Sequence, residues 1–189
     1  GASPREIYFT SGGSEGDNQA LLTGAKNGAA AGKRHIISTA MEHHAVLHTL
    51  EALEQQSFSV TYLKPDSEGR ISPRRLEEAI RPDTALVSVM YVNNETGSVQ
   101  PIRQLAAVCH GHEIPLHTDA VQAVGHIPVD VKADGVDFLT LSAHKFHGPR
   151  GIGALYVRRG IRLQSLIDGG GQERGKRAGT ENLPGIVGM

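Results

Sequence analysis

The chain has few cysteines and few aromatic residues. Its single cysteine, Cys109, excludes an intramolecular disulfide and any metal site made of cysteines alone, and it favours a reducing compartment such as the cytoplasm. Tryptophan is absent and aromatic residues make up only 4%, so platforms for stacking nucleic-acid bases or sugars are poorly supplied. No apolar run reaches the roughly 18 to 20 residues that cross a bilayer. We therefore expect a small-molecule ligand and no nucleic-acid or membrane partner.

The charge is nearly balanced. The 19 basic and 20 acidic side chains leave a net charge of -1, without the positive excess typical of a nucleic-acid binder. With 39% hydrophobic residues, the 189-residue chain can bury a core. Its 23 glycines are typical of a fold in which loop backbone approaches a ligand closely.

Short β-rich runs alternate with amphipathic stretches along the chain. This alternation predicts an α/β fold with a largely parallel sheet. Ligands of such sheets bind at the carboxyl ends of the strands, so polar residues at strand ends are the candidates for a site. The strands are expected at residues 6–10, 35–39, 59–63, 84–91, 114–118, 136–141 and 153–157, and the helices at 14–27, 45–56, 72–80 and 102–110.

The most informative strand end is the one that precedes Gly148. It delivers a hydroxyl from Ser142, an imidazole from His144 and an amine from Lys145 before the chain turns. An amine that is partly desolvated near other cations or donors can attack a carbonyl to form a Schiff base. A surface lysine after a strand explains the pattern equally well.

Two other strand ends carry groups suited to a phosphorylated pyridine cofactor. Asp119 follows an apolar strand, with Gln122 one turn further on if a short helix begins there. A carboxylate that keeps a pyridine nitrogen protonated makes the ring an electron sink. The stretch from Thr10 to Asn18 opens a helix and places Gly13 and Ser14 where a helix N-terminus can bind a phosphate. A capping aspartate and an ordinary glycine-rich turn are the alternatives.

Two further strand ends carry ring-stacking and amide groups. The imidazole of His43 could stack on a flat ring, and Asn94 follows the longest apolar strand. A solvated loop explains both residues more simply. The chain's 10 histidines raise the question of a metal site, but none of their spacings matches a set of zinc ligands, so we expect no metal.

Together these motifs resemble a known family. The stretch SAHKFHGPRG at 142–151 occurs with HTDAVQ at 117–122, VNNE at 92–95, GGGQERG at 169–175 and RAGTEN at 177–182. Their order and spacing, over nearly the whole chain, closely resemble those of the NifS-type cysteine desulfurases of the class V aminotransferase fold. The resemblance implies a three-layer α/β/α domain with a mostly parallel mixed sheet, as in aspartate aminotransferase-like enzymes.

The resemblance also implies a role for each candidate residue. Lys145 would bind pyridoxal 5'-phosphate (PLP) covalently and later transfer protons, Asp119 would face the ring nitrogen, and Gln122 would face the phenolic oxygen. His43 would stack on the ring, and Asn94 would contact cofactor and substrate. The phosphate would be bound by a threonine from the partner subunit of a homodimer, matched by Thr180, and by four residues of this chain: Gly13, Ser14, Ser142 and His144.

The implied reaction converts L-cysteine to L-alanine. The sulfur would pass to a protein cysteine as a persulfide and then to an acceptor or scaffold protein for iron–sulfur cluster or thio-cofactor synthesis. In the family that cysteine follows the RAGTEN motif, where this sequence has none. Cys109 lies on the apolar side of a predicted helix, where a buried, unreactive thiol is expected. We expect residues 1–168 to be most of the PLP-binding large domain, residues 169–189 to begin the connection to a small domain, and this chain alone to be inactive.

Two alternatives remain open. Another class V PLP enzyme, such as a selenocysteine lyase or an aminotransferase, would share the lysine, the aspartate and the phosphate site. A non-catalytic fragment that serves assembly or partner binding would need none of them.

Overall fold

The computed structural model describes residues 1–189 and is built around one seven-stranded sheet. The strand order is β1-β7-β6-β5-β4-β2-β3. Strands β3, β2, β4, β5 and β6 are parallel, whereas β7 is antiparallel to both β6 and β1. The predicted mostly parallel mixed sheet is therefore confirmed. The strands are β1 (Ile7–Thr10), β2 (His35–Thr39), β3 (Ser59–Leu63), β4 (Thr84–Ser88), β5 (Leu116–Asp119), β6 (Phe138–Ser142) and β7 (Gly153–Val157).

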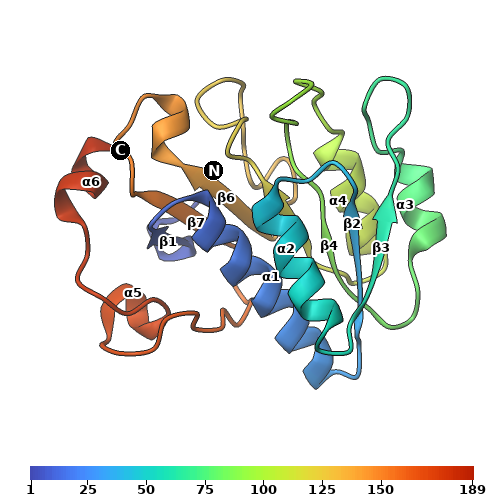
Figure 1. The fold of residues 1–189 in the computed structure, drawn as a ribbon, viewed down its shortest axis with the longest axis horizontal. Coiled ribbons are helices and arrows are strands. Elements are labelled where there is room, and N and C mark those ends of the chain that lie inside the picture. The colour runs from blue at the N-terminus through green and yellow to red at the C-terminus, as the bar shows by residue number, and fades with distance from the viewer.

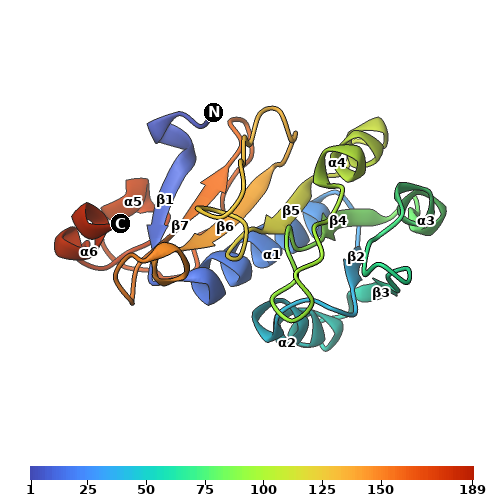
Figure 2. The same ribbon diagram turned by 90° about the horizontal axis from the view of Figure 1, so that it is seen from above.

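Helices cover both faces of the sheet. The long helix α1 (Gly13–Ala30) and α2 (His44–Glu54) lie on one face, and α3 (Pro73–Ala79) and α4 (Ile102–Gly111) lie on the other (Figure 1). Figure 2 shows two short helices beyond β1 at the sheet edge. None of the helices is long and apolar enough to cross a membrane. The short elements are η1 (Pro4–Glu6), η2 (Ala143–Phe146), α5 (Gln172–Gly175) and α6 (Leu183–Gly188).

The core has two parts, one on each face of the sheet. In β2, Ile36 packs in the cluster beneath α1 and α2, whereas Ile37 packs in the cluster beneath α3 and α4. Successive strand side chains point to opposite faces, so a sheet covered on both sides needs apolar residues throughout. This explains the uninterrupted apolar runs of the sequence and confirms the three-layer α/β/α arrangement.

Glycines bring α1 unusually close to the sheet. A Cβ atom at Gly16 would lie 2.7 Å from Thr140 Cγ2 on β6, and one at Gly24 would lie 2.7 Å from Leu86 Cδ2 on β4. Larger residues at these positions would push the helix outward. The first turns of α1 are therefore held directly against the carboxyl ends of the central strands.

All predicted strands and helices are present, with ends that differ by at most three residues. The largest difference in the sheet concerns the strand predicted over 84–91, because β4 ends at Ser88. The neighbouring strand β2 ends at Thr39, and the Met90 N–H donates to Glu42 Oε1 at 3.0 Å. A side chain thus replaces the pairing on the β2 side, while Val89 N and Tyr91 N still donate to His117 O and Asp119 O of β5.

Candidate active site

The carboxyl ends of the parallel strands lie along the upper edge of the molecule in Figure 1. A cavity of about 410 Å³ lies at these ends. We call it the strand-end cavity. Its lining includes nine of the ten residues predicted from the sequence, which come from five different segments of the chain. The predicted residues that line it are Gly13, Ser14, His43, Asn94, Asp119, Gln122, Ser142, His144 and Lys145.

The N-terminus of α1 opens into this cavity. The first N–H groups of a helix have no partner within the helix, so they can bind an anion. A Cβ atom at Gly13 would lie 2.8 Å from Val121 Cγ2 and 3.8 Å from Ser142 Cβ, so only a glycine fits between the helix and these loops. Ser142 Oγ lies 2.9 Å from His144 Nδ1. These groups form a small polar cup at the helix N-terminus.

The tight turn η2 after β6 presents Lys145. The turn ends at His147, whose φ is 68°, and Gly148 N donates to Ala143 O at 2.9 Å. A Cβ at Gly148 would lie 2.8 Å from Ala143 Cβ, which explains the glycine in this motif. The Lys145 side chain is exposed at the cavity rim, because η2 lies at the outer edge of the molecule (Figure 1). The exposure of Lys145 agrees with the surface lysine that the sequence left open, while its place in the cavity lining agrees with a site amine.

Asp119 ends strand β5 and is only 6% exposed. Its Oδ1 accepts a hydrogen bond from Val121 N at 2.9 Å, so it caps the following turn and also lines the cavity. Burial, and then the nearby Asp17 carboxyl, raise the pKa of Asp119 to about 7. Gln122 is half-buried and lies in a turn, not in a short helix that begins after Asp119.

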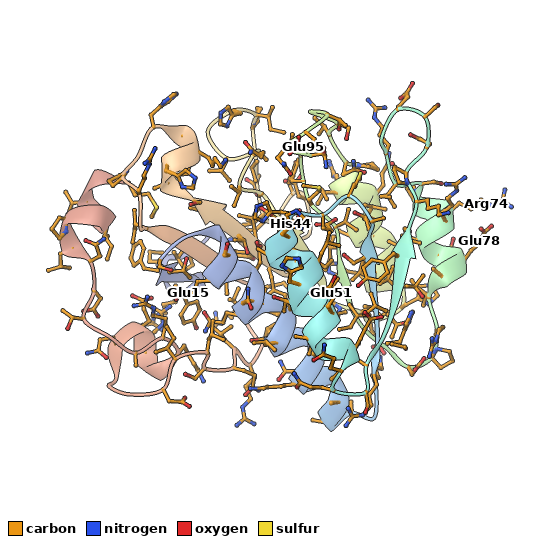
Figure 3. All side chains as sticks on the ribbon, in the orientation of Figure 1. Glu15, His44, Glu51, Arg74, Glu78 and Glu95 are labelled. Atoms are coloured by element: carbon orange, nitrogen blue, oxygen red, sulfur yellow. The ribbon has the colours of Figure 1, made fainter.

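His43 and Asn94 approach the cavity from two loops. His43 is the N-cap residue of α2, and its Nδ1 accepts a hydrogen bond from Ala45 N at 3.1 Å. The buried Asn93 accepts hydrogen bonds from the loop after β4 and thereby shapes it, whereas Asn94 is exposed and donates to Glu95 Oε1. Figure 3 shows Glu95 in this loop, at the same edge of the molecule as η2.

Thr180 is the one predicted site residue that this chain does not bring to the cavity. It is exposed and lines a separate hollow of about 160 Å³ with Phe9 and Gly151.

Two buried carboxyl groups were not among the residues predicted from the sequence. Asp17 lines the strand-end cavity, and Glu42 lies beside it. Burial raises the pKa of Asp17 to about 7 and that of Glu42 to about 8. The sequence spacing indicates this position of Asp17, since it follows Gly13 by four residues and so falls on the same face of α1.

A larger hollow of about 660 Å³ lies at the opposite, amino ends of the strands, near Ala85 and Phe138. It holds none of the residues predicted for the site. Because ligands of open α/β sheets bind at the carboxyl ends, we assign the site to the smaller cavity.

Curated relatives match the whole chain. "Cysteine desulfurase IscS" of Methanosarcina thermophila is 54% identical over 189 residues, which are 100% of this chain and 46% of that protein. "Putative cysteine desulfurase IscS 1" of Bacillus subtilis (strain 168) is 52% identical over 189 residues, which are 100% of this chain and 50% of that protein. The chain thus spans about half the length of the curated relatives it matches.

Solved structures and a family model agree with these relatives. The structure titled "SspA in complex with cysteine" is 48% identical, with a TM-score of 0.95 over 99% of this chain and 54% of that chain. That of DndA from Streptomyces lividans is 45% identical, with a TM-score of 0.94 over 99% of this chain and 54% of that chain. The family model of aminotransferase class V matches residues 1–189. With this fold and this match along its whole length, the chain belongs to the class V aminotransferase family.

Proposed function

We propose that this chain is the PLP-binding part of a cysteine desulfurase that acts on L-cysteine. The observation that carries the proposal is the strand-end cavity, which combines an accessible amine, a buried carboxyl and a helix N-terminus suited to a phosphate. The names of the relatives, and the cysteine in one related structure, support the choice of substrate.

The residues of the cavity fit PLP. The cup at Gly13 would be filled by a Cβ atom, and it has hydroxyl and imidazole groups from Ser142 and His144 beside it, as a phosphate needs. Asp119 is the carboxyl suited to the ring nitrogen, and Lys145 is the amine suited to the aldehyde carbon. When bound, PLP supplies a ring that withdraws electrons from the substrate carbon next to the amine.

Each residue then has a definite task. Lys145 Nζ would hold the cofactor covalently and would accept and return protons during the reaction. Asp119 would keep a proton on the ring nitrogen, and the Gln122 amide would donate to the phenolic oxygen. His43 would stack on the ring and keep water from it, and Asn94 would contact cofactor and substrate.

The sulfur step needs a thiolate outside these residues. A protein thiolate attacks the substrate sulfur, the carbon–sulfur bond breaks, a sulfur–sulfur bond forms, and the substrate carbon takes a proton to become L-alanine. Cys109 is fully buried in α4, and burial raises its pKa to about 12, so it does not supply this thiolate. We propose that residues 1–189 alone do not complete the reaction.

The remaining parts of the proposal concern assembly. Residues 1–168 would form most of the large domain, and 169–189 would lead toward a small domain. The position of Thr180 outside its own chain's cavity supports a role in the partner's site of a homodimer. An acceptor or scaffold protein would receive the sulfur, and the lone buried cysteine favours a cytoplasmic location.

Covalent labelling tests the proposal. The purified chain is incubated with PLP, its visible absorbance is recorded, and the adduct is reduced with borohydride and located by peptide mass spectrometry. We expect modification of Lys145, none in Lys145→Ala, and full modification in Lys26→Ala, which changes an exposed lysine of α1. A spectral change on adding L-cysteine that L-aspartate does not cause supports the substrate. Absence of a Lys145 adduct contradicts the proposal.

A further inference from the structure

A histidine lies directly behind Asp119 in the sheet. His117 precedes Asp119 by two residues on β5, so both side chains point to the face that α1 covers. The imidazole is fully buried between hydroxyls of the two neighbouring strands, with Nδ1 2.9 Å from Ser88 Oγ and Nε2 3.1 Å from Thr140 Oγ1. Neutral hydroxyls surround the ring, and the carboxyl nearest its Nε2 comes from α1.

That carboxyl belongs to Asp17. Its Oδ1 lies 3.5 Å from His117 Nε2 and has no hydrogen-bond partner, although the side chain is only 2% exposed. The close approach of Gly16 to Thr140 holds this turn of α1 against the strands. Asp17 also lines the strand-end cavity, as Asp119 does. Two buried carboxyls therefore share one cavity wall, with an imidazole beside them.

We propose that Asp17 and His117 form an uncharged proton-holding pair behind Asp119, which leaves Asp119 as the carboxyl that ionises when the cavity is occupied. Two neighbouring buried carboxylates repel each other, so a proton retained on Asp17 favours the charge on Asp119. In this assignment a hydrogen on Asp17 Oδ1 faces His117 Nε2 across the 3.5 Å gap, and Nε2 also accepts from the Thr140 hydroxyl. The ring hydrogen is then on Nδ1, where Ser88 Oγ accepts it. Asp17 and His117 are positioning residues, since neither carries out a step on the substrate.

The surrounding charges agree with this assignment. Burial raises the pKa of Asp17 to about 7 and lowers that of His117 to about 4, so both favour their uncharged forms. Asp119 is faced by Asp17 from α1, by His117 from its own strand and by His43 from the start of α2. The buried Glu42, whose pKa burial raises to about 8, interacts with both aspartates and adds to the repulsion where it is ionised.

The electrostatic interaction between Asp17 and Asp119 can be measured without cofactor. Carbon-13 NMR of the carboxyl groups of the purified chain follows the titration of Asp119. We expect Asp119 to ionise about one pH unit below Asp17, and Asp17→Asn, and independently Asp17→Ser, to leave the Asp119 midpoint unchanged, because both replacements are uncharged like the protonated carboxyl. The matched control is Glu51→Gln, which removes an exposed carboxylate from the outer side of α2 (Figure 3) and leaves the midpoint unchanged. Ionisation of Asp17 before Asp119, or an Asp119 midpoint that falls by about one pH unit in either Asp17 variant, overturns the proposal.

Nitrogen-15 NMR tests the state of His117. We expect a neutral ring with its hydrogen on Nδ1 from about pH 5 to about pH 8. The ring would thus stay neutral even below the ordinary histidine midpoint of about 6.5. An imidazolium signal at neutral pH would reveal an ion pair with Asp17 and overturn the proposal. The effect of an ionised Asp119 on a cofactor ring nitrogen rests on the proposed function, but the order in which Asp119 and Asp17 ionise does not. Ionisation of Asp119 before Asp17 without a PLP adduct on Lys145 would thus contradict the proposed function and leave this inference standing.

Discussion

Arg177 Nε donates to Glu15 Oε1 at 2.7 Å and Nη2 donates to Oε2 at 3.1 Å, so the two side chains form a paired contact. Both are mostly buried, with 21% of the arginine and 10% of the glutamate side chain exposed. Glu15 belongs to the first turn of α1, and Arg177 precedes Thr180 by three residues. The pair therefore ties the segment that carries Thr180 to the helix N-terminus that forms the phosphate cup.

Breaking this pair should loosen the Thr180 segment. In Arg177→Gln, we expect the backbone amides of Ala178 and Gly179 to exchange hydrogen about tenfold faster, because a charge-assisted pair is lost. Hydrogen exchange followed by mass spectrometry measures this. Arg74→Gln is the control, since its partner Glu78 is also exposed (Figure 3) and such pairs contribute little.

The same pair predicts an acid dependence. Burial acts to raise the pKa of Glu15, but hydrogen bonds from Arg177 and Ser11 outweigh it and lower the pKa. The contribution of the pair to stability is thus present above the unfolded pKa and is lost as the pH falls through the folded one. In acid, the amide hydrogen exchange rates of Ala178 and Gly179 in the wild-type chain should approach those in Arg177→Gln. A difference between the two chains that stays constant at all pH values would contradict this.

Gly13→Ala should weaken PLP binding about tenfold, which corresponds to about 1.4 kcal/mol. The new Cβ would meet Val121 Cγ2 at 2.8 Å and displace the turn that carries Gln122. Removing that contact in Gly13→Ala/Val121→Ala should restore most of the affinity. Gly111→Ala is the matched control, because nothing lies within 4 Å of a Cβ there. Affinity is measured by absorbance titration, and an unaffected Gly13→Ala would contradict the assignment of the cup.

The cofactor-free chain should lose stability as the pH rises from about 6.5 to about 8. Burial raises the folded pKa values of Asp17 and Asp119 to about 7 and of Glu42 to about 8. Their stabilising contribution is complete below the unfolded value of about 4 and is lost as the pH rises through the folded values, at up to about 1.4 kcal/mol per pH unit for each group.

Urea unfolding at both pH values tests this dependence. Glu42→Gln should unfold with a clearly smaller difference between the two, because one of the three titrating groups is gone. Its amide oxygen can still accept the hydrogen bonds from Thr39 Oγ1 and Met90 N. A free energy of unfolding that is equal or higher at pH 8 in the wild-type chain would contradict the assignment of buried, raised carboxyls.

Cys109 should react with thiol reagents only after unfolding. It is fully buried, and its thiolate is disfavoured by burial, which raises the pKa to about 12. A disulfide reagent should modify the thiol rapidly in urea and negligibly in the native chain. Cys109→Ala should cost about 1 kcal/mol of stability and leave PLP binding unchanged. Rapid modification of the native chain would show that the thiol is accessible.

Local patterns were sufficient to predict most of the site. The strand that ends at Asp119 and the strand that ends at Ser142 are both read from short apolar runs, and parallel strands bring their carboxyl ends to one edge. The exposure of Lys145 could not be read in this way. A run of residues around a lysine does not show which other segments pack over it, and here η2 stands at the outer edge.

The sequence by itself determined the α/β class, the order of strands and helices, and the set of polar residues delivered to one sheet edge. These follow from the periods of side-chain direction and from turn residues, which act over a few positions of the chain. Only the tertiary structure decided that Asp17 faces His117, that Arg177 reaches Glu15 and that Thr180 lies outside the cavity. Those relationships depend on how α1 and the last segment pack against the sheet, over separations that no local pattern records.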